Sequence, residues 1–159
     1  APVDQWNPEV CGDIDIRMLK DGRWIHDGRP IQRMKMVQLF SSLLKLEGDQ
    51  YFLVTPVEKL RIEVEDTPFT VISSDLMDGS WVLPNNLGDK QLLDSEHPLD
   101  AFHSASPRVI WRGNLPARIQ QNVMYQWQMH ALDHGGFDGK ILWLESGGML
   151  FQLDQADES

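Results

Sequence analysis

The sequence predicts an α+β protein of two similar lobes, each a curved antiparallel sheet with one helix. Residues 13–18 alternate strictly between charged and apolar side chains, which is typical of a half-buried strand. Two later segments, one in each half of the chain, carry apolar residues at helical spacing. Asp21-Gly22 and Asp78-Gly79 are dipeptides typical of tight hairpin turns. The expected lobes are residues 1–68 and 69–159.

The first lobe is expected to consist mainly of strands. An irregular arm over residues 1–10 precedes the strand at 13–18. Residues 24–26 return as its hairpin partner, because the Asp-Gly turn separates two apolar segments. After the helix of this lobe come two more apolar segments, which are predicted to be strands over 51–55 and 60–65.

One helix is predicted in each lobe. In the first, Pro30 suits the opening turn, where its missing N–H costs no hydrogen bond, and Gly48 suits the end. The apolar stripe between them predicts a helix over 30–47. A similar stripe in the second lobe predicts a helix over 116–132. The side chains expected to be buried by these helices are Val37, Phe40 and Leu44 in the first and Val123 and Trp127 in the second.

The second lobe is expected to contain strands on both sides of a long irregular insertion. The insertion covers residues 84–107, which are rich in turn-forming residues, with one short strand near Leu92. Strands are predicted at 81–83 and 108–112. A final hairpin pairs 141–145 with 149–153 around a Ser-Gly-Gly turn.

The two halves of the chain can be superimposed with a fixed offset. Gly28 and Gly113, which lie 85 positions apart, each follow a predicted strand and precede a helix start that contains proline. The same offset pairs further residues of the two predicted helices: Arg33 with Arg118, Met34 with Ile119, Leu39 with Met124, Phe40 with Tyr125, and Leu44 with Met129. We therefore predict an internal duplication, although shared helix periodicity contributes to the match.

The net charge of −10 over 159 residues limits the classes of partner. Nucleic-acid binding needs clustered Lys and Arg, and the 14 basic residues are scattered, so we expect no nucleic-acid partner. An anionic membrane surface is disfavoured for the same reason, and no apolar run approaches the roughly 20 residues that span a bilayer. The single cysteine and the absence of a signal-peptide pattern favour a cytoplasmic protein.

Three stretches combine charged residues with apolar strand positions: Cys11-Gly-Asp-Ile-Asp-Ile-Arg17, Thr55-Pro-Val-Glu-Lys59 and Glu65-Asp-Thr-Pro-Phe69. A resemblance to known proteins is carried by the first of these stretches together with Asp21-Gly-Arg-Trp24, Tyr51-Phe-Leu-Val-Thr-Pro-Val-Glu-Lys59 and Val64-Glu-Asp-Thr-Pro-Phe69. On these residues the chain resembles a bacterial family known as domain of unknown function 1285. The resemblance implies a duplicated α+β architecture whose C-terminal lobe is superficially similar to pleckstrin-homology folds. It also implies a nucleotide-like small-ligand site between the lobes and a role in signal transduction. No catalytic residues come with this family.

The candidate binding residues come from these stretches and from the second lobe. Clefts between lobes are favoured ligand sites, and an acidic protein that binds an anion must place cations in its site. The cations expected to do so are Arg17, Lys59 and Arg112. The full set of candidate ligand-binding residues is Asp13, Asp15, Arg17, Thr55, Glu58, Lys59, Glu65, Asp66 and Arg112.

Other chemistries are weighed against structural roles. Asp13 and Asp15 share one face of a strand and could hold a metal, whereas Arg17 on the same face favours a charge-paired surface. His130 and His134 have a spacing that can bind a metal, but capping of a helix end is the preferred interpretation. The single thiol is interpreted as structural, and the chain has neither a P-loop nor a Gly-x-Ser-x-Gly elbow.

The predicted function is a non-enzymatic small-ligand-binding or signalling module. We expect no cofactor, and we assign neither catalytic residues nor metal ligands. One alternative is a metal-dependent hydrolase that uses Asp13 and Asp15 with Glu58 or Glu65. The other is a protein-interaction scaffold, which requires an exposed apolar patch and no formed pocket.

Overall fold

A computed structural model describes residues 2–9, 11–103 and 105–155. It confirms the predicted α+β class. The chain divides into two compact units: unit 1 comprises Ala1–Pro68 and Arg112–Leu115, and unit 2 comprises Phe69–Trp111 and Pro116–Ser159. Within the described ranges, no helix is long and apolar enough to cross a membrane.

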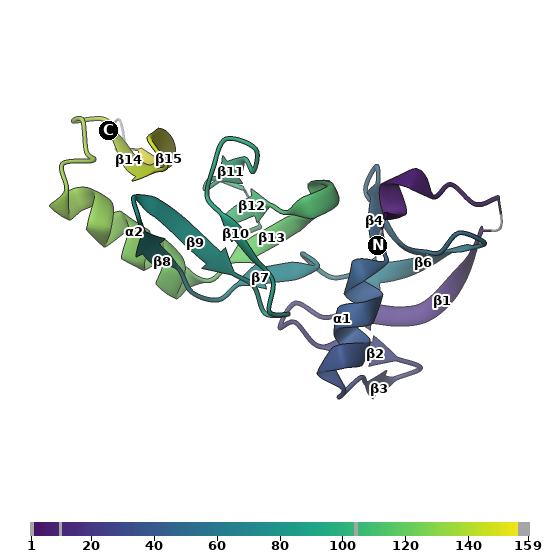
Figure 1. The fold of residues 1–159 in the computed structure, drawn as a ribbon. Helices are drawn as coiled ribbons and strands as arrows, with labels where there is room; N and C mark the ends of the chain where they lie inside the picture. Colours follow the sequence, from purple (N-terminus) through teal and green to yellow (C-terminus); the bar gives the residue numbers. More distant parts are fainter. Residues whose placement is uncertain (1, 10, 104, 156–159) are drawn as a thin grey trace. The chain divides into compact units, whose positions relative to one another are not determined.

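Unit 1 is built on a six-stranded sheet with one α-helix (Figure 1). The strand order is β3-β2-β1-β6-β5-β4. Neighbouring strands are antiparallel except β1 and β6, which are parallel, so the purely antiparallel sheet expected from the sequence is wrong in this respect. The elements are η1 (Val3–Gln5), β1 (Cys11–Met18), β2 (Trp24–His26), β3 (Arg29–Pro30), α1 (Met34–Ser42), β4 (Leu44–Glu47), β5 (Gln50–Val54) and β6 (Lys59–Val64).

The alternation in β1 decides which face of this sheet is buried. Ile16 and Met18 lie in the core of unit 1, while the charged residues between and before them are exposed, as predicted. Trp24 on β2 is buried, and its ring stacks on that of Phe40 from α1, with centroids 6.3 Å apart. Helix α1 therefore covers the apolar face that the alternation creates.

The helix predicted over 30–47 is shorter than expected. It covers only Met34–Ser42, because Pro30 belongs to strand β3 and Leu44 begins strand β4. Val37 and Leu44 are buried as predicted, whereas Phe40 is only half-buried. Leu44 is buried as a strand residue opposite Leu53.

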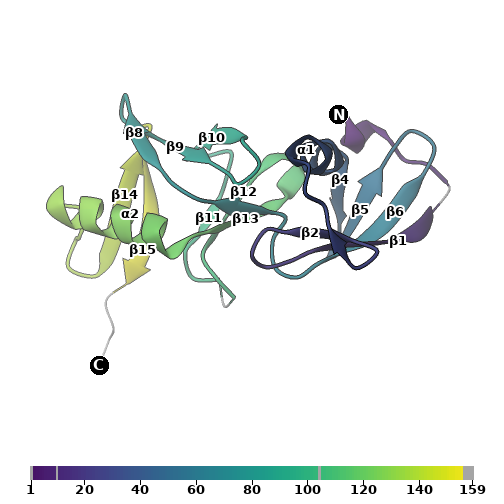
Figure 2. The ribbon, with the colours of Figure 1, turned by 90° about the horizontal axis from the view of Figure 1, so that it is seen from below.

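The described residues of unit 2 form three smaller sheets and one α-helix (Figure 2). The sheets have the orders β10-β9-β8, β11-β12-β13-β7 and β14-β15, and β13 runs parallel to β7. The elements are β7 (Phe69–Val71), β8 (Asp75–Met77), β9 (Ser80–Pro84), β10 (Lys90–Leu92), β11 (Leu99–Asp100), β12 (Arg108–Ile110), β13 (Pro116–Ile119), α2 (Gln121–Asp133), β14 (Ile141–Ser146) and β15 (Met149–Gln155).

The second predicted helix also begins later than expected. Residues Pro116–Ile119 form β13, whose alternate residues Ala117 and Ile119 are buried, and α2 starts at Gln121. The strand expected over 108–112 ends at Ile110, and a 3-10 turn, η2 (Arg112–Asn114), follows in unit 1.

Buried polar side chains join the parts of unit 2. Trp127 on α2 donates from Nε1 to Ser74 Oγ at 3.1 Å, and both residues are buried. Ser146 on β14 donates to the carbonyl of Leu93 at 2.7 Å and accepts from the N–H of Trp81 at 2.9 Å. The hydroxyl of Ser146 therefore holds three chain segments together.

The two units share some order of elements, but their strand orders differ. In each unit the helix is followed by an antiparallel hairpin, β4–β5 after α1 and β14–β15 after α2. The offset of 85 residues is not kept, since it pairs Leu44 of strand β4 with Met129 of helix α2. The resemblance of the C-terminal lobe to pleckstrin-homology folds stays a prediction.

Candidate functional site

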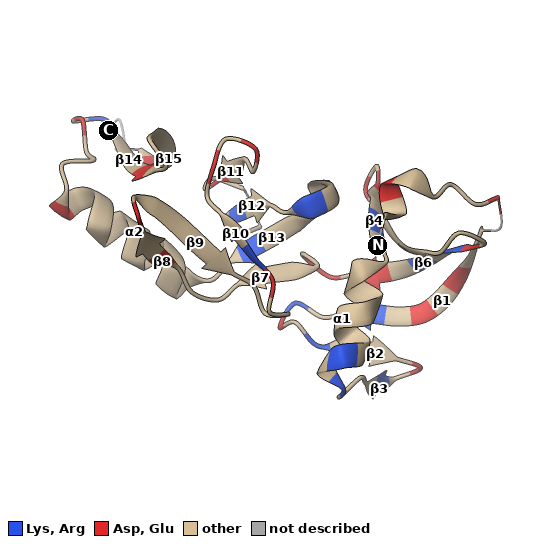
Figure 3. Ribbon diagram, viewed as in Figure 1, with Lys and Arg blue, Asp and Glu red and all other residues tan. Residues whose placement is uncertain are grey.

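The charged residues predicted from β1 form ion pairs across the sheet of unit 1. Arg61 donates from Nε to Asp13 at 2.8 Å, and Arg17 donates from Nε to Glu63 at 3.0 Å. Both pairs join the parallel strands β1 and β6, and their side chains are more than half exposed. Figure 3 shows the acidic and basic positions together on these strands. Asp15 on the same strand is exposed.

Thr55, Glu58 and Lys59 belong to the connection between β5 and β6. The hydroxyl of Thr55 accepts a hydrogen bond from the N–H of Glu58 at 3.1 Å, which closes the turn. Lys59 Nζ lies 2.9 Å from Glu47 Oε2 and 4.8 Å from the ring centroid of Phe52. The hydrogen bond from Lys59 is the main reason that the pKa of Glu47 is lowered.

The remaining predicted residues, Glu65, Asp66 and Arg112, lie in other parts of unit 1. Glu65 Oε2 accepts from the N–H of Lys20 at 2.8 Å, at the β1–β2 turn. Arg112 Nη2 donates to the carbonyl of Ser41 at 2.7 Å, in the last turn of α1. Asp66 is half-buried. The structure thus pairs Asp13 and Arg17 with neighbours on one sheet face, and it gives Lys59, Glu65 and Arg112 separate local partners.

The metal-site interpretation finds no support among the residues that the structure describes. They contain no group of three His, Cys, Asp or Glu side chains that could hold a metal ion. The carboxylate of Asp13 is engaged by Arg61, which is the charge-paired arrangement that the sequence favoured.

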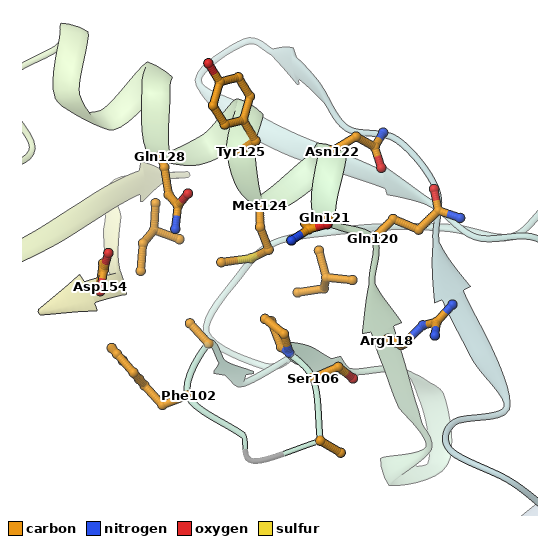
Figure 4. A pocket seen from close by; sticks show the side chains of 15 residues that line it. Phe102, Ser106, Arg118, Gln120, Gln121, Asn122, Met124, Tyr125, Gln128 and Asp154 are labelled. Atoms are coloured by element: carbon orange, nitrogen blue, oxygen red, sulfur yellow. The ribbon is translucent and has the colours of Figure 1, made fainter. Parts of the chain in front are cut away.

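A cavity of about 920 Å³ lies within unit 2, in a place that the sequence did not indicate. It is built from the first turns of α2, the end of β13, the connection between β11 and β12, and β15. Figure 4 shows Met124 in its middle, with Arg118 on one side and Asp154 on the other. The full lining is Ala101, Phe102, Ala105, Ser106, Pro107, Arg118, Ile119, Gln120, Gln121, Asn122, Met124, Tyr125, Gln128, Leu153 and Asp154.

The lining of this cavity combines uncharged amides with apolar surface. Four amide side chains supply both donors and acceptors, and they come from Gln120, Gln121, Asn122 and Gln128. The N-cap Gln120 makes no side-chain cap hydrogen bond, and the first turn of α2 carries no acidic residue. The positive end of the helix dipole is therefore not neutralised by the first turn itself.

Two arginines stand directly opposite each other beside the cavity. Arg108 on β12 and Arg118 on β13 are partners in the antiparallel register, so both side chains emerge on one face of the sheet. Arg108 donates to the carbonyl and the hydroxyl of Ser106, which lines the cavity together with Arg118. Asp100 faces Arg108 from the other neighbouring strand. Like charges directly opposite one another are unfavourable, and the carboxylate of Asp100 offsets part of that cost.

A second cavity, of about 320 Å³, contains two histidines of α2. The rings of His130 and His134 are stacked with centroids 4.0 Å apart, and Trp81 meets His130 edge-on at 5.0 Å. His134 Nδ1 donates to the carbonyl of His130 at 2.8 Å, which is the helix-end role predicted for this pair. Burial is the main cause of the lowered pKa of His130, and the charge of His134 lowers it further.

Comparison with known proteins assigns the chain to a family. A model described as the N-terminal domain of a domain of unknown function, DUF1285, matches residues 1–67, and one described as the DUF1285 C-terminal domain matches residues 68–153. The chain belongs to the DUF1285 family. The resemblance noted from the sequence is therefore confirmed. No curated protein matches the chain.

Two crystal structures of DUF1285 proteins are similar to this chain. The protein from Silicibacter pomeroyi DSS-3 is 34% identical with a TM-score of 0.85, covering 98% of this chain and 87% of its own. The protein from Shewanella baltica OS155 is 23% identical with a TM-score of 0.59, covering 70% of this chain and 87% of its own, and supports the fold alone. Both are named only by the family, so the function of this chain has to be argued from its own residues.

Proposed function

We propose that this DUF1285 protein is a non-enzymatic module that binds a small anionic ligand in the cavity of unit 2 that Arg118 lines. The observation that carries the proposal is the cross-strand pair Arg108–Arg118 beside a cavity of about 920 Å³. Ligand-binding cavities typically measure about 300–1,000 Å³ and combine apolar walls with a few polar groups. A ligand that binds only the native state stabilises it, so ligand binding should also raise the stability of unit 2.

The composition of the lining favours a nucleotide-like ligand, with an anionic end and a flat ring. Phe102, Met124 and Tyr125 supply apolar and aromatic surface for a ring. The amides of Gln120, Gln121, Asn122 and Gln128 supply donors and acceptors for its edges and for sugar hydroxyls. A protein that binds a ligand without converting it suits a signalling role, in which the ligand-bound state of the protein is the signal.

The cations predicted from the sequence offer a rival position for the same ligand. Arg17 pairs with Glu63, Lys59 pairs with Glu47, and Arg112 donates to the carbonyl of Ser41. None of the three is in the lining of the cavity of about 920 Å³. The hydrolase alternative has no comparable support, because the described carboxylates include no metal-holding cluster. We propose the ligand position at Arg118 because this residue lines the cavity, and we use the other cations as comparisons.

A thermal-shift screen with nucleoside mono-, di- and triphosphates and inorganic phosphate tests the proposal. A ligand present at 100 times its Kd stabilises the native state by about 2.7 kcal/mol, which raises Tm by several degrees. Arg118→Gln removes a charge-assisted contact worth about 1.5–3 kcal/mol. We expect it to weaken binding roughly ten- to a hundred-fold.

Matched variants distinguish the two positions. Arg29→Gln removes an exposed arginine of unit 1 that belongs to neither set, and it should leave affinity unchanged. If Arg17→Gln or Lys59→Gln loses ligand binding while Arg118→Gln keeps the wild-type affinity, the ligand binds in unit 1 and not at Arg118. If no compound in the panel shifts Tm, or every variant binds equally well, the proposal of an anionic ligand is wrong.

A further inference from the structure

Helix α2 is apolar on two opposite faces. Val123, Trp127 and Ala131 are buried against the rest of unit 2. Tyr125, Met129 and Leu132 follow one another at helical spacing on the other side, where Tyr125 is 64% and Leu132 52% exposed. A surface helix normally carries polar residues opposite its buried stripe, and a helix that is apolar on both sides is normally covered on both.

The exposed face of α2 forms one wall of a groove. A cavity of about 340 Å³ lies beside it, and Phe137, 48% exposed, and Leu142 line the cavity with the outward residues of α2. The rest of the lining comes from the end of β15. This groove adjoins the ligand cavity and shares Tyr125, Gln128 and Asp154 with it, whereas Met129, Leu132, Phe137 and Leu142 line the groove and are not in the lining of the cavity. Exposed apolar grooves of this kind mark interaction surfaces.

Acidic residues occur in the lining of the groove and next to it in sequence. Asp154 lines the groove, Asp133 is adjacent in sequence to Leu132, and Asp138 is adjacent to Phe137. The connection that contains Asp138 also contains one basic residue, Lys140. Helix α2 itself contains neither Lys nor Arg, which Figure 3 shows as an absence of blue along it. Unit 2 has 12 acidic and 4 basic residues in its sequence, so it accounts for −8 of the net charge of −10.

We propose that this groove binds a basic amphipathic helix of a partner protein, with apolar side chains in the groove and Lys or Arg facing the acidic rim. The apolar stripe of α2 matches the helix-in-groove mode, in which anchors recur at three- and four-residue spacing. The charge argues against a second copy of this chain, because two acidic units repel each other. It argues against an anionic membrane surface for the same reason.

The test uses two synthetic helical peptides of about four turns each, with Leu at helical anchor positions. In the first peptide all the remaining positions are Lys, and in the second they are Glu. Each peptide carries a fluorescent label, and binding is measured by fluorescence anisotropy. We expect the Leu/Lys peptide to bind with a micromolar Kd that weakens as salt is added, and the Leu/Glu peptide not to bind. No phosphate ligand is present, so the result does not depend on the function proposed above.

Variants locate the binding surface. Leu132→Ser removes buried contact area from the groove and should weaken the Leu/Lys peptide roughly ten-fold. Leu92→Ser makes the same change at an exposed leucine on β10, away from the groove, and should leave Kd within about two-fold. Asp154→Lys reverses a rim charge and should reduce the preference for the Leu/Lys peptide.

Several results would overturn the inference. Binding of neither peptide up to about 1 mM, or equal binding of both, contradicts a basic helical partner. Equal losses in Leu132→Ser and Leu92→Ser contradict the groove as the site. A concentration-dependent dimer in sedimentation equilibrium that Leu132→Ser abolishes identifies a second copy as the occupant instead. Thermal unfolding of each variant confirms that it is folded before binding is compared.

Discussion

Replacing Lys59 by alanine tests whether this residue stabilises unit 1. Its side chain is 16% exposed and that of its partner Glu47 36%, and its ammonium also lies over the ring of Phe52. Exposed ion pairs contribute about 0–1 kcal/mol, and breaking a buried pair costs about 3–5 kcal/mol. Because this ion pair has intermediate exposure, we expect it to contribute about 1–1.5 kcal/mol to the free energy of unfolding. The cation–π contact with Phe52 adds about 0.5–1 kcal/mol. The expected loss of unfolding free energy in Lys59→Ala is therefore about 1.5–2.5 kcal/mol at neutral pH.

The pH dependence of this loss provides a second check. Because Lys59 lowers the pKa of Glu47 below its ordinary value of 4.5, the pair stabilises the folded state above that value. The ion-pair contribution disappears as the pH falls through the lowered pKa of Glu47, whereas the cation–π contact with Phe52 persists. The difference between wild type and Lys59→Ala should therefore shrink in acid to about 0.5–1 kcal/mol. Urea unfolding followed by tryptophan fluorescence, at neutral pH and at about pH 3, measures both differences.

A matched variant controls for the removal of a surface cation. Arg17→Ala breaks the Arg17–Glu63 pair, whose side chains are 53% and 73% exposed, and should lose no more than about 0.5 kcal/mol. The reasoning is refuted if Lys59→Ala is as stable as wild type at neutral pH. It is also refuted if the difference persists unchanged in acid. In the first case the lysine would be free to serve the rival ligand position.

Two further predictions concern stability. Ser146→Ala removes the hydroxyl that pairs with the N–H of Trp81 and the carbonyl of Leu93, and it should destabilise unit 2 by about 2–4 kcal/mol. Ser42→Ala, at the end of α1, is the control and should change the unfolding free energy by no more than about 0.5 kcal/mol. Urea unfolding measures both variants, and equal effects would contradict the bridging role of Ser146. The lowered pKa of His130 means that the folded state prefers the neutral ring, so stability is present above the ordinary value of 6.5 and is lost as pH falls below it. His130→Gln should flatten the decline of Tm between about pH 6.5 and 5. A slope equal to that of the wild type would show that burial of His130 has no such effect.

The sequence located most strands but misjudged where the helices end. Leu43 and Leu44 continue the apolar stripe of α1, so periodicity alone extends the helix to Gly48. The competing signal was the alternation from Leu44 to Glu47 followed by Gly48-Asp49, which forms the two-residue turn between β4 and β5. The hydroxyls of Ser41 and Ser42 bond back to carbonyls one turn earlier, as expected near a helix end.

The candidate ligand cavity was missed for a different reason. Charged residues stand out in a sequence, and those of β1 and β6 proved to pair with one another across parallel strands that are distant in sequence. The cavity of unit 2 is lined mainly by amides and apolar residues, which have no distinctive pattern. The run Gln120-Gln121-Asn122 at a helix start was the one available signal. The opposition of Arg108 and Arg118 depends on strand register, which single-sequence patterns do not fix.

The short segment Arg112–Leu115 affects how the chain can fold during synthesis. It belongs to unit 1 although it follows most of the strands of unit 2, and it brings the fully buried Leu115 and the arginine that bonds to the end of α1. A ribosome that has released only residues 1–68 has therefore not yet supplied every part of the first unit. Vectorial folding, in which an N-terminal domain is finished before the next one emerges, cannot run to completion here. A gene fragment cut after Pro68 would likewise encode a unit that lacks part of its own interior.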